Sequence, residues 1–309
     1  MPRFRYRQVL WMSIVLVASG LSLRSQEKAD PSVLTLERIF ESPEFALDRF
    51  GPARWMKDGK SYTTVEDSAA VKGGQDIVLY SAETGQREVL IPASRLIPQG
   101  ETAPLPIDDY EWSADGKLLL VFTNSQRVWR RNTRGDYWVL SLSDWSLRKL
   151  GTGLEAQSLM FAKFSPQGDR IAYVSKNNIY VESLTGGQIL PLTQDGSETL
   201  INGTFDWVYE EEFNLRDGFR WSPDGERIAF WQLDSSAVRE FHMINNTDGL
   251  YPRVITFRYP KVGEANSSCR VGVMSSSGGE VTWFRVPGDP SNNYIARMEW
   301  TPNPREVIL

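Results

Sequence analysis

Three adjacent carboxylates stand among large aromatic residues in the stretch Phe205-Asp206-Trp207-Val208-Tyr209-Glu210-Glu211-Glu212-Phe213. Neighbouring anions repel each other, and in a partly buried site this repulsion is costly unless a cation lies nearby. Acidic runs are usually solvated, but the aromatic flanks indicate that this run packs against the rest of the protein. In a helical turn successive side chains point about 100° apart, so two of the three glutamates can converge on one site while the third pairs elsewhere.

Covalent and metal chemistry have few candidate residues. The chain has one histidine, His242, and one cysteine, Cys269, and it contains no Gly-x-Ser-x-Gly sequence. A Ser-His-Asp triad would therefore have to use His242, and a histidine-rich metal site cannot be built. Cys269 lacks a plausible base partner and cannot form an internal disulfide. We therefore predict no catalytic residue, no metal and no cofactor in this chain.

A repeated turn organises the elements around the acidic segment. An aromatic residue is followed by a Ser-Pro-Asp-Gly-like turn and then by an apolar run that reads as a buried strand. The good copies begin at Trp112, Phe164 and Trp221, a weaker copy begins at Trp55, and a degenerate copy begins at Trp300. The intervals between these aromatic positions are 57, 52, 57 and 79 residues.

A second strand motif recurs later in each repeat, at Asp76–Tyr80, Asp136–Leu140 and Asn178–Val181. Each repeat therefore has room for about four strands, which is typical of one blade of a β-propeller. The predicted fold class is all-β, a β-propeller of four-stranded blades, with about four blades and the start of a fifth. A β-sandwich with coincidental turns is the alternative, and no sustained 3.6-residue apolar period supports a helical solenoid.

The long fourth interval contains extra chain between Asp234 and Gly263. Within it, residues 238–263, which we call the arm, include Phe241, Met243 and Ile244. We interpret the arm as an extended hairpin that projects from the fourth blade. Exposed apolar residues on such a hairpin are expected to be buried against another surface, and a partner subunit is one candidate. A solvated insertion loop is the competing interpretation.

The acidic-aromatic stretch resembles the Asp-Trp-Val-Tyr-Glu-Glu-Glu signature of the dipeptidyl peptidase IV subfamily within the prolyl oligopeptidase family of serine peptidases. The resemblance extends from about Leu36 to Leu309. It implies that Glu211 and Glu212 bind the free α-amino group of a peptide substrate and that Glu210 is their structural neighbour. It also implies a propeller of eight blades and dimerisation through the arm.

The same resemblance places a substrate-binding arginine in a Trp-Arg step of the second blade. Trp129-Arg130 stands there, so Arg130 is the implied residue, and Arg131 is the alternative by one register. Arg130 would hold the carbonyl of the penultimate residue and balance the glutamates. We call Arg130, Glu211 and Glu212 the clamp. Two extended residues span roughly 7 Å, so a nucleophile fixed at that distance from the clamp would release dipeptides.

The catalytic serine, aspartate and histidine implied by the resemblance belong to a C-terminal α/β-hydrolase domain, which we predict to be absent from this chain. Residues 31–309 are expected to be an incomplete N-terminal propeller, a substrate-gating region that does not hydrolyse peptides by itself. The alternatives are a non-catalytic periplasmic scaffold and an inactive homologue that kept the clamp.

Residues 1–30 are expected to be a signal peptide or an N-terminal anchor. Arg3, Arg5 and Arg7 precede an uncharged, largely apolar run from Val9 to Leu23. We therefore expect a periplasmic or secreted protein, attached to a membrane only if the segment is uncleaved. The net charge of −5 and the lack of a further Lys/Arg cluster argue against nucleic acid as a partner. The expected partners are peptides with a free N-terminus and a second copy of the chain.

Overall fold

The computed structural model describes residues 30, 32–47 and 50–309. The chain divides into two compact units, Met1–Phe50 and Gly51–Leu309. The predicted signal or anchor segment lies outside the described residues except for Asp30. In the first unit, helix α2 (Leu36–Phe40) begins after Thr35, whose side chain accepts a hydrogen bond from the Arg38 N–H, and a 3₁₀ turn, η1, covers Pro43–Phe45. No helix among the described residues is long and apolar enough to cross a membrane.

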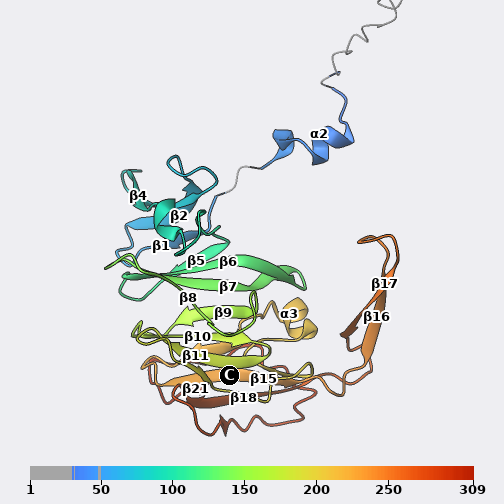
Figure 1. Ribbon diagram of the computed structural model, residues 1–309. Coiled ribbons are helices and arrows are strands. Elements are labelled where there is room, and N and C mark those ends of the chain that lie inside the picture. Colours follow the sequence, from blue (N-terminus) through green and yellow to red (C-terminus); the bar gives the residue numbers. More distant parts are fainter. Residues whose placement is uncertain (1–29, 31, 48–49) are drawn as a thin grey trace, which may run out of the picture. The chain divides into compact units, whose positions relative to one another are not determined.

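The second unit consists of antiparallel sheets, shown in Figure 1 as a stack. The first sheet contains β1 (Ala53–Trp55), β2 (Ser61–Asp67), β3 (Gln75–Ser81) and β4 (Arg87–Ile91), and a 3₁₀ turn, η2 (Ala93–Leu96), follows it. The next four strands are β5 (Asp109–Trp112), β6 (Leu118–Val128), β7 (Arg131–Ser141) and β8 (Leu147–Lys149). They are followed by β9 (Leu159–Phe164), β10 (Arg170–Ser175), β11 (Asn178–Ser183) and β12 (Ile189–Pro191). A short β7–β9 pairing joins these two groups.

The last repeats are less regular. Strands β14 (Phe219–Trp221), β15 (Arg227–Asp234), β18 (Ser268–Ser275) and β19 (Thr282–Trp283) form a sheet in which β13 (Leu200–Asn202) also pairs with β15. A two-stranded ladder of β20 (Glu299–Trp300) and β21 (Val307–Ile308) comes last. The arm contains β16 (Glu240–Asn245) and β17 (Arg253–Arg258), so the predicted hairpin is present, and it stands apart from the stacked sheets (Figure 1).

The repeated turn has the geometry that its residues require. In each good copy the N–H of the glycine donates to the carbonyl of the serine three residues before it, and that serine is buried. The glycines adopt a left-handed backbone, with φ of 72° at Gly116, 73° at Gly168 and 67° at Gly225. A residue with a Cβ avoids this region, which explains the recurrent glycine.

Alternation along the strands explains how the sheets stack. In β6, Leu119 packs in one cluster with Ile77 of the first sheet, whereas Leu120 packs in another with Tyr173 of the third. Strands β10 and β15 divide their side chains between neighbouring clusters in the same way. Because successive side chains of a strand point to opposite faces, each middle sheet buries both of its faces. The predicted all-β architecture of repeated four-stranded units is confirmed.

The tryptophan of the repeat also links one sheet to the sheet before it. Three indole N–H groups donate across the interface, from Trp112 to Thr63 Oγ1 at 3.0 Å, from Trp221 to the Lys163 carbonyl at 3.3 Å and from Trp300 to the Arg220 carbonyl at 3.2 Å. The aromatic residue therefore contributes both buried area and a directional contact between neighbouring sheets.

Candidate functional site

The first part of the site is the tip of the β6–β7 hairpin. Val128 pairs with Arg131, which leaves Trp129 and Arg130 as the turn, and Trp129 adopts a left-handed φ of 48° as tight hairpin turns require. The ladder shifts register twice between Thr123 and Arg127. Such irregularities bend a strand. The long hairpin presents Arg130 at its tip, with the arginine side chain 73 % exposed.

The second part is helix α3 (Trp207–Phe213), which carries the three glutamates. The Asp206 carboxylate caps it, accepting from the Tyr209 N–H at 3.1 Å and from Ser267 Oγ at 2.6 Å. Burial raises the pKa of Asp206, and these hydrogen bonds oppose the rise. Tyr209 is buried against Phe205, with ring centroids 5.3 Å apart. The aromatic flanks therefore attach the helix to the core, as their sequence predicted.

The three carboxylates have different environments. Glu210 is only 5 % exposed and accepts from Arg216 Nε at 3.0 Å. Burial raises the pKa of Glu210, while Arg216 acts in the opposite direction. Glu211 Oε1 accepts from Arg130 Nε at 2.5 Å. Glu212 is exposed and makes no hydrogen bond or ion pair with the described residues.

The geometry brings Arg130 of the β6–β7 turn together with Glu211 of helix α3. Arg130 uses Nε for this contact, and its two terminal nitrogens make no hydrogen bond within the described part of the chain. Arg131 is exposed on β7 and forms no ion pair with described residues. Of the two neighbouring arginines, the structure thus places Arg130 at the carboxylates. The terminal nitrogens of Arg130 can donate to an acceptor on a ligand, and Glu212, one position after Glu211 on α3, can bind a cation.

Glu212 lines a cavity of about 440 Å³ beside α3. Its other walls come from Trp207 and Val208 of the helix, the end of the arm and the loop before β20, with Tyr259–Glu264, Asn266, Ser291, Asn292 and Tyr294. The buried Asn266 Oδ1 has no hydrogen-bond partner in the described part of the chain. Sequence reasoning did not find this cavity, because its walls come together only in the folded chain.

His242 and Cys269 do not form a catalytic pair. His242 is exposed on β16, where Nδ1 lies 2.9 Å from Thr256 Oγ1. Cys269 is buried, and burial raises the pKa of its thiol to about 11. A thiol with such a pKa is a poor nucleophile at neutral pH. Among the described residues, no group of three His, Cys, Asp or Glu side chains could hold a metal ion.

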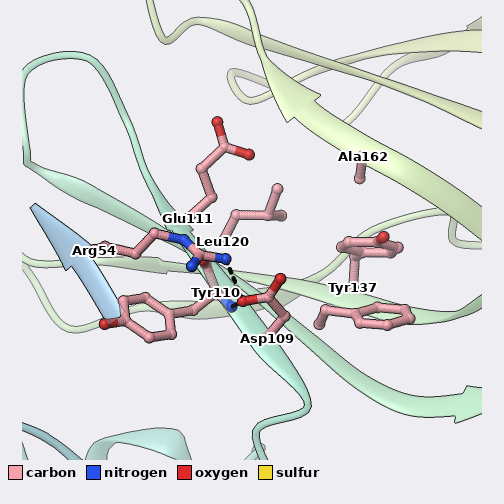
Figure 2. Close-up of a pocket in the computed structure, with 8 residues that line it drawn as sticks. Arg54, Asp109, Tyr110, Glu111, Leu120, Tyr137 and Ala162 are labelled. Atoms are coloured by element: carbon pink, nitrogen blue, oxygen red, sulfur yellow. Dashed lines mark hydrogen bonds and ion pairs between the residues drawn. The ribbon is translucent and has the colours of Figure 1, made fainter. Parts of the chain in front are cut away.

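A smaller cavity of about 160 Å³ lies where β1, β5 and β9 approach one another, and Figure 2 shows it. Arg54 and Asp109 point toward each other across it, with Nη2 and Oδ1 2.5 Å apart. The Arg54 guanidinium also lies over the Tyr110 ring, 5.6 Å from its centroid. These charges satisfy each other, so the cavity offers less for a charged ligand than the surroundings of Glu211 and Glu212.

Comparison with known proteins identifies the family of this chain. The family described as "Dipeptidyl peptidase IV (DPP IV) N-terminal region" matches residues 113–309. Dipeptidyl aminopeptidase B of Saccharomyces cerevisiae is 32 % identical over 84 % of this chain and 32 % of the relative. Inactive dipeptidyl peptidase 10 of Rattus norvegicus is 28 % identical over 97 % of this chain and 36 % of the relative.

A solved structure is also similar. The crystal structure of Porphyromonas gingivalis dipeptidyl peptidase 4 superposes with a TM-score of 0.77 at 29 % identity, covering 90 % of this chain and 38 % of that one. The chain thus spans about a third of the length of the curated relatives it matches.

Proposed function

The chain belongs to the family of dipeptidyl peptidase IV N-terminal regions, a β-propeller region, and from this premise we propose that it captures the free amino terminus of peptides for a serine-type dipeptidyl peptidase. The observation that carries the proposal is the contact between Arg130 and Glu211, together with Glu212, the next residue of α3, which has no partner within the described part of the chain. Glu211 and Glu212 bind the ammonium group, and Arg130 binds the first carbonyl that follows.

The charges of the clamp suit this task. Glu211 pairs with Arg130, whereas Glu212 makes no ion pair with the described residues, so the charge of Glu212 is available to a cationic ligand. Charge-assisted hydrogen bonds from an ammonium to carboxylates contribute ~1.5–3 kcal/mol each. The terminal nitrogens of Arg130 remain available as donors, and a peptide carbonyl oxygen is a suitable acceptor.

The clamp also determines how far the scissile bond lies from the bound amino terminus. Two residues in extended conformation span roughly 7 Å from the captured amine. A nucleophile held at that distance can reach only the bond after the second residue. Binding far from the scissile bond then determines where the peptide is cut. An acetylated N-terminus would leave the glutamates without their cation, which is a strong basis for rejection.

The test compares a free and a blocked amine on the whole protein that carries this chain. The dipeptide Ala-Ala should bind at least ten-fold more tightly than N-acetyl-Ala-Ala, as measured by titration calorimetry. The substitutions Glu211→Gln and Glu212→Gln should remove this preference, whereas Glu83→Gln, in an exposed turn of the first sheet, should keep it. Equal binding of the two dipeptides by the unaltered protein would refute the proposal.

A second candidate is a homologue that keeps the clamp without cleaving peptides. The similarity to Inactive dipeptidyl peptidase 10, which extends over 97 % of this chain, supports this second candidate. The whole protein would then prefer Ala-Ala over its acetylated form but release no dipeptide from longer peptides. Dipeptide release, measured by mass spectrometry, separates the two candidates. A pure scaffold would show neither binding preference nor release.

The proposal extends to association and location. The outer part of the arm exposes Met243, Ile244 and Val254, and apolar residues on a projecting hairpin fit a partner surface. We assign this partner as a second copy of the protein. Export to the periplasm or the medium rests on the sequence of residues 1–30. Sedimentation of the Ile244→Glu variant tests association through the arm. Cell fractionation tests export.

A further inference from the structure

Five aromatic side chains connect the arm to both parts of the clamp. We call this cluster the aromatic bridge, and it comprises Trp129, Trp207, Phe241, Phe257 and Tyr259. Trp129 contacts Phe257 edge-on at 5.5 Å between ring centroids, and Trp207 contacts Tyr259 at 4.5 Å. Phe241 lies 5.8 Å from Phe257 and 5.6 Å from Tyr259. The bridge is therefore continuous from the β6–β7 tip to α3.

The two ends of the bridge are sequence neighbours of the clamp. Trp129 directly precedes Arg130 in the hairpin turn, and Trp207 is the first residue of α3, which carries Glu211 and Glu212. Trp129 is 38 % exposed, and Phe257 is the one residue of the described chain with which its ring is paired. Loss of the Phe257 ring would therefore remove the ring contact of Trp129 and free the turn that presents Arg130.

Neither part of the clamp is held firmly by its own element. Helix α3 has seven residues, too few for much intrinsic stability. The β6–β7 ladder is irregular before its tip, and Arg130 is largely exposed. A cavity of about 310 Å³ lies between Trp129, Trp207 and Phe257, so the tip does not rest on a solid core. The ring contacts cross this space in addition to the ion pair between Arg130 and Glu211.

The base of the arm is closed by pairing within the hairpin and begins at the buried Val238, whose N–H donates to the carbonyl of Ser235, just before the arm, at 3.0 Å. Phe241 and Phe257 are directly paired across β16 and β17. Arg258 Nη1 donates to the carbonyl of the buried Val238 at 2.6 Å, and the Tyr259 N–H donates to the Arg239 carbonyl at 3.1 Å. The inner part of the arm is thus fixed while the outer part is exposed.

We propose that the base of the arm is a positioning element of the clamp, and that Phe257 acts through Trp129 to hold Arg130 at the distance from Glu211 and Glu212 that a peptide amino terminus requires. This inference rests on the proposed function of the clamp. It assigns to the arm a second role besides association. Phe257 touches no substrate in this role, so it is a positioning residue.

The experiment measures binding of Ala-Ala and N-acetyl-Ala-Ala to the whole protein by calorimetry. Phe257→Ala should weaken Ala-Ala binding about ten-fold and leave the weak binding of the acetylated form unchanged. Phe257→Tyr, which keeps the ring, should restore binding to within two-fold. Trp55→Ala, which removes an exposed ring of the first repeat outside the bridge and the arm, is the matched control and should also stay within two-fold.

A second variant guards against misfolding of the first. Trp129→Asn removes the same ring contact from the other side, and asparagine tolerates the left-handed backbone of the turn. Melting temperature and circular dichroism identify which variants are folded. Trp129→Asn should reproduce the ten-fold loss.

A double variant tests whether Phe257 acts on binding through Arg130. In an Arg130→Ala background, Phe257→Ala should weaken Ala-Ala binding less than two-fold, because the group that it positions is gone. A ten-fold loss in that background, or unchanged binding in folded Phe257→Ala and Trp129→Asn variants, would overturn the inference. If the unaltered protein does not distinguish the two dipeptides, the proposed function itself fails, which is a different result.

Discussion

Arg130 and Glu211 are 81 residues apart in the chain, yet Arg130 Nε donates to Glu211 Oε1 at 2.5 Å. The arginine comes from a hairpin turn of the second repeat and the glutamate from the short helix before β14. An ion pair between a largely exposed arginine and a glutamate contributes little to folding stability. We therefore expect replacement of either residue to affect ligand binding more than folding stability.

Removal of the arginine should weaken the binding of free amino termini. Arg130→Ala removes the donors for the peptide carbonyl and leaves two carboxylates to repel each other. We expect about ten-fold weaker binding of Ala-Ala, which corresponds to about 1.4 kcal/mol. Arg131→Ala, which removes the adjacent exposed arginine, should stay within two-fold. Calorimetry on the whole protein measures both, and equal losses in the two variants would contradict the assignment of Arg130.

The sequence was most informative where structure is local. The turn at Ser222-Pro-Asp-Gly225, the buried run after it and the helical turn at Glu210–Glu212 all follow from neighbouring residues, and they are confirmed. The family resemblance carried by residues 205–213 is confirmed as well. Local rules work here because turn backbone and strand alternation depend on a few adjacent side chains.

Long-range packing was not predictable in the same way. Nothing in the order of the three glutamates shows that Glu210 pairs with Arg216 while Glu212 faces a cavity. The contact of Trp129 with Phe257 depends on how the arm folds back against the second repeat. The assignment of Arg130 over Arg131 came from the family resemblance, and the clamp roles of the three residues stay predictions.

Substitution of two glycines, Gly116 and Gly203, can distinguish the cost of backbone strain from the cost of steric crowding. Gly116 has φ of 72° with open space at the position of a Cβ, whereas at Gly203, with φ of 73°, a Cβ would lie 2.7 Å from Ile179 Cγ1. Gly116→Ala should reduce the free energy of unfolding by about 1 kcal/mol from the left-handed backbone alone. Gly203→Ala should cost clearly more, because strain and overpacking add. Urea unfolding of both variants measures the difference, and equal losses would show that crowding at Gly203 is relieved by movement.

The thiol of Cys269 should be unreactive in the folded protein. Burial raises its pKa to about 11 from the ordinary value of 9.0. The folded state therefore holds the proton more tightly, and the stability that this group contributes is present below pH 9 and is lost as the pH rises toward 11. Labelling with a thiol reagent at pH 8 should be slow in buffer and fast in 6 M guanidinium. Rapid labelling of the folded protein would contradict the burial of this residue.

The buried Glu210 should make the unfolding free energy depend on pH in a defined direction. Burial raises the pKa of this carboxyl above its ordinary value, so the folded state binds its proton more tightly than the unfolded state. The stability contributed by Glu210 is then fully present below the unfolded pKa of 4.5 and decreases as the pH rises through the folded pKa. Glu210→Gln removes the titration while leaving an amide oxygen that can accept from Arg216 Nε. The unfolding free energy of the variant minus that of the unaltered protein therefore follows the titration of Glu210 together with its electrostatic coupling to Glu211. Urea unfolding from pH 4 to pH 7 should show this difference rising with pH. A difference that is flat or falls would mean that Arg216 outweighs burial at this carboxylate.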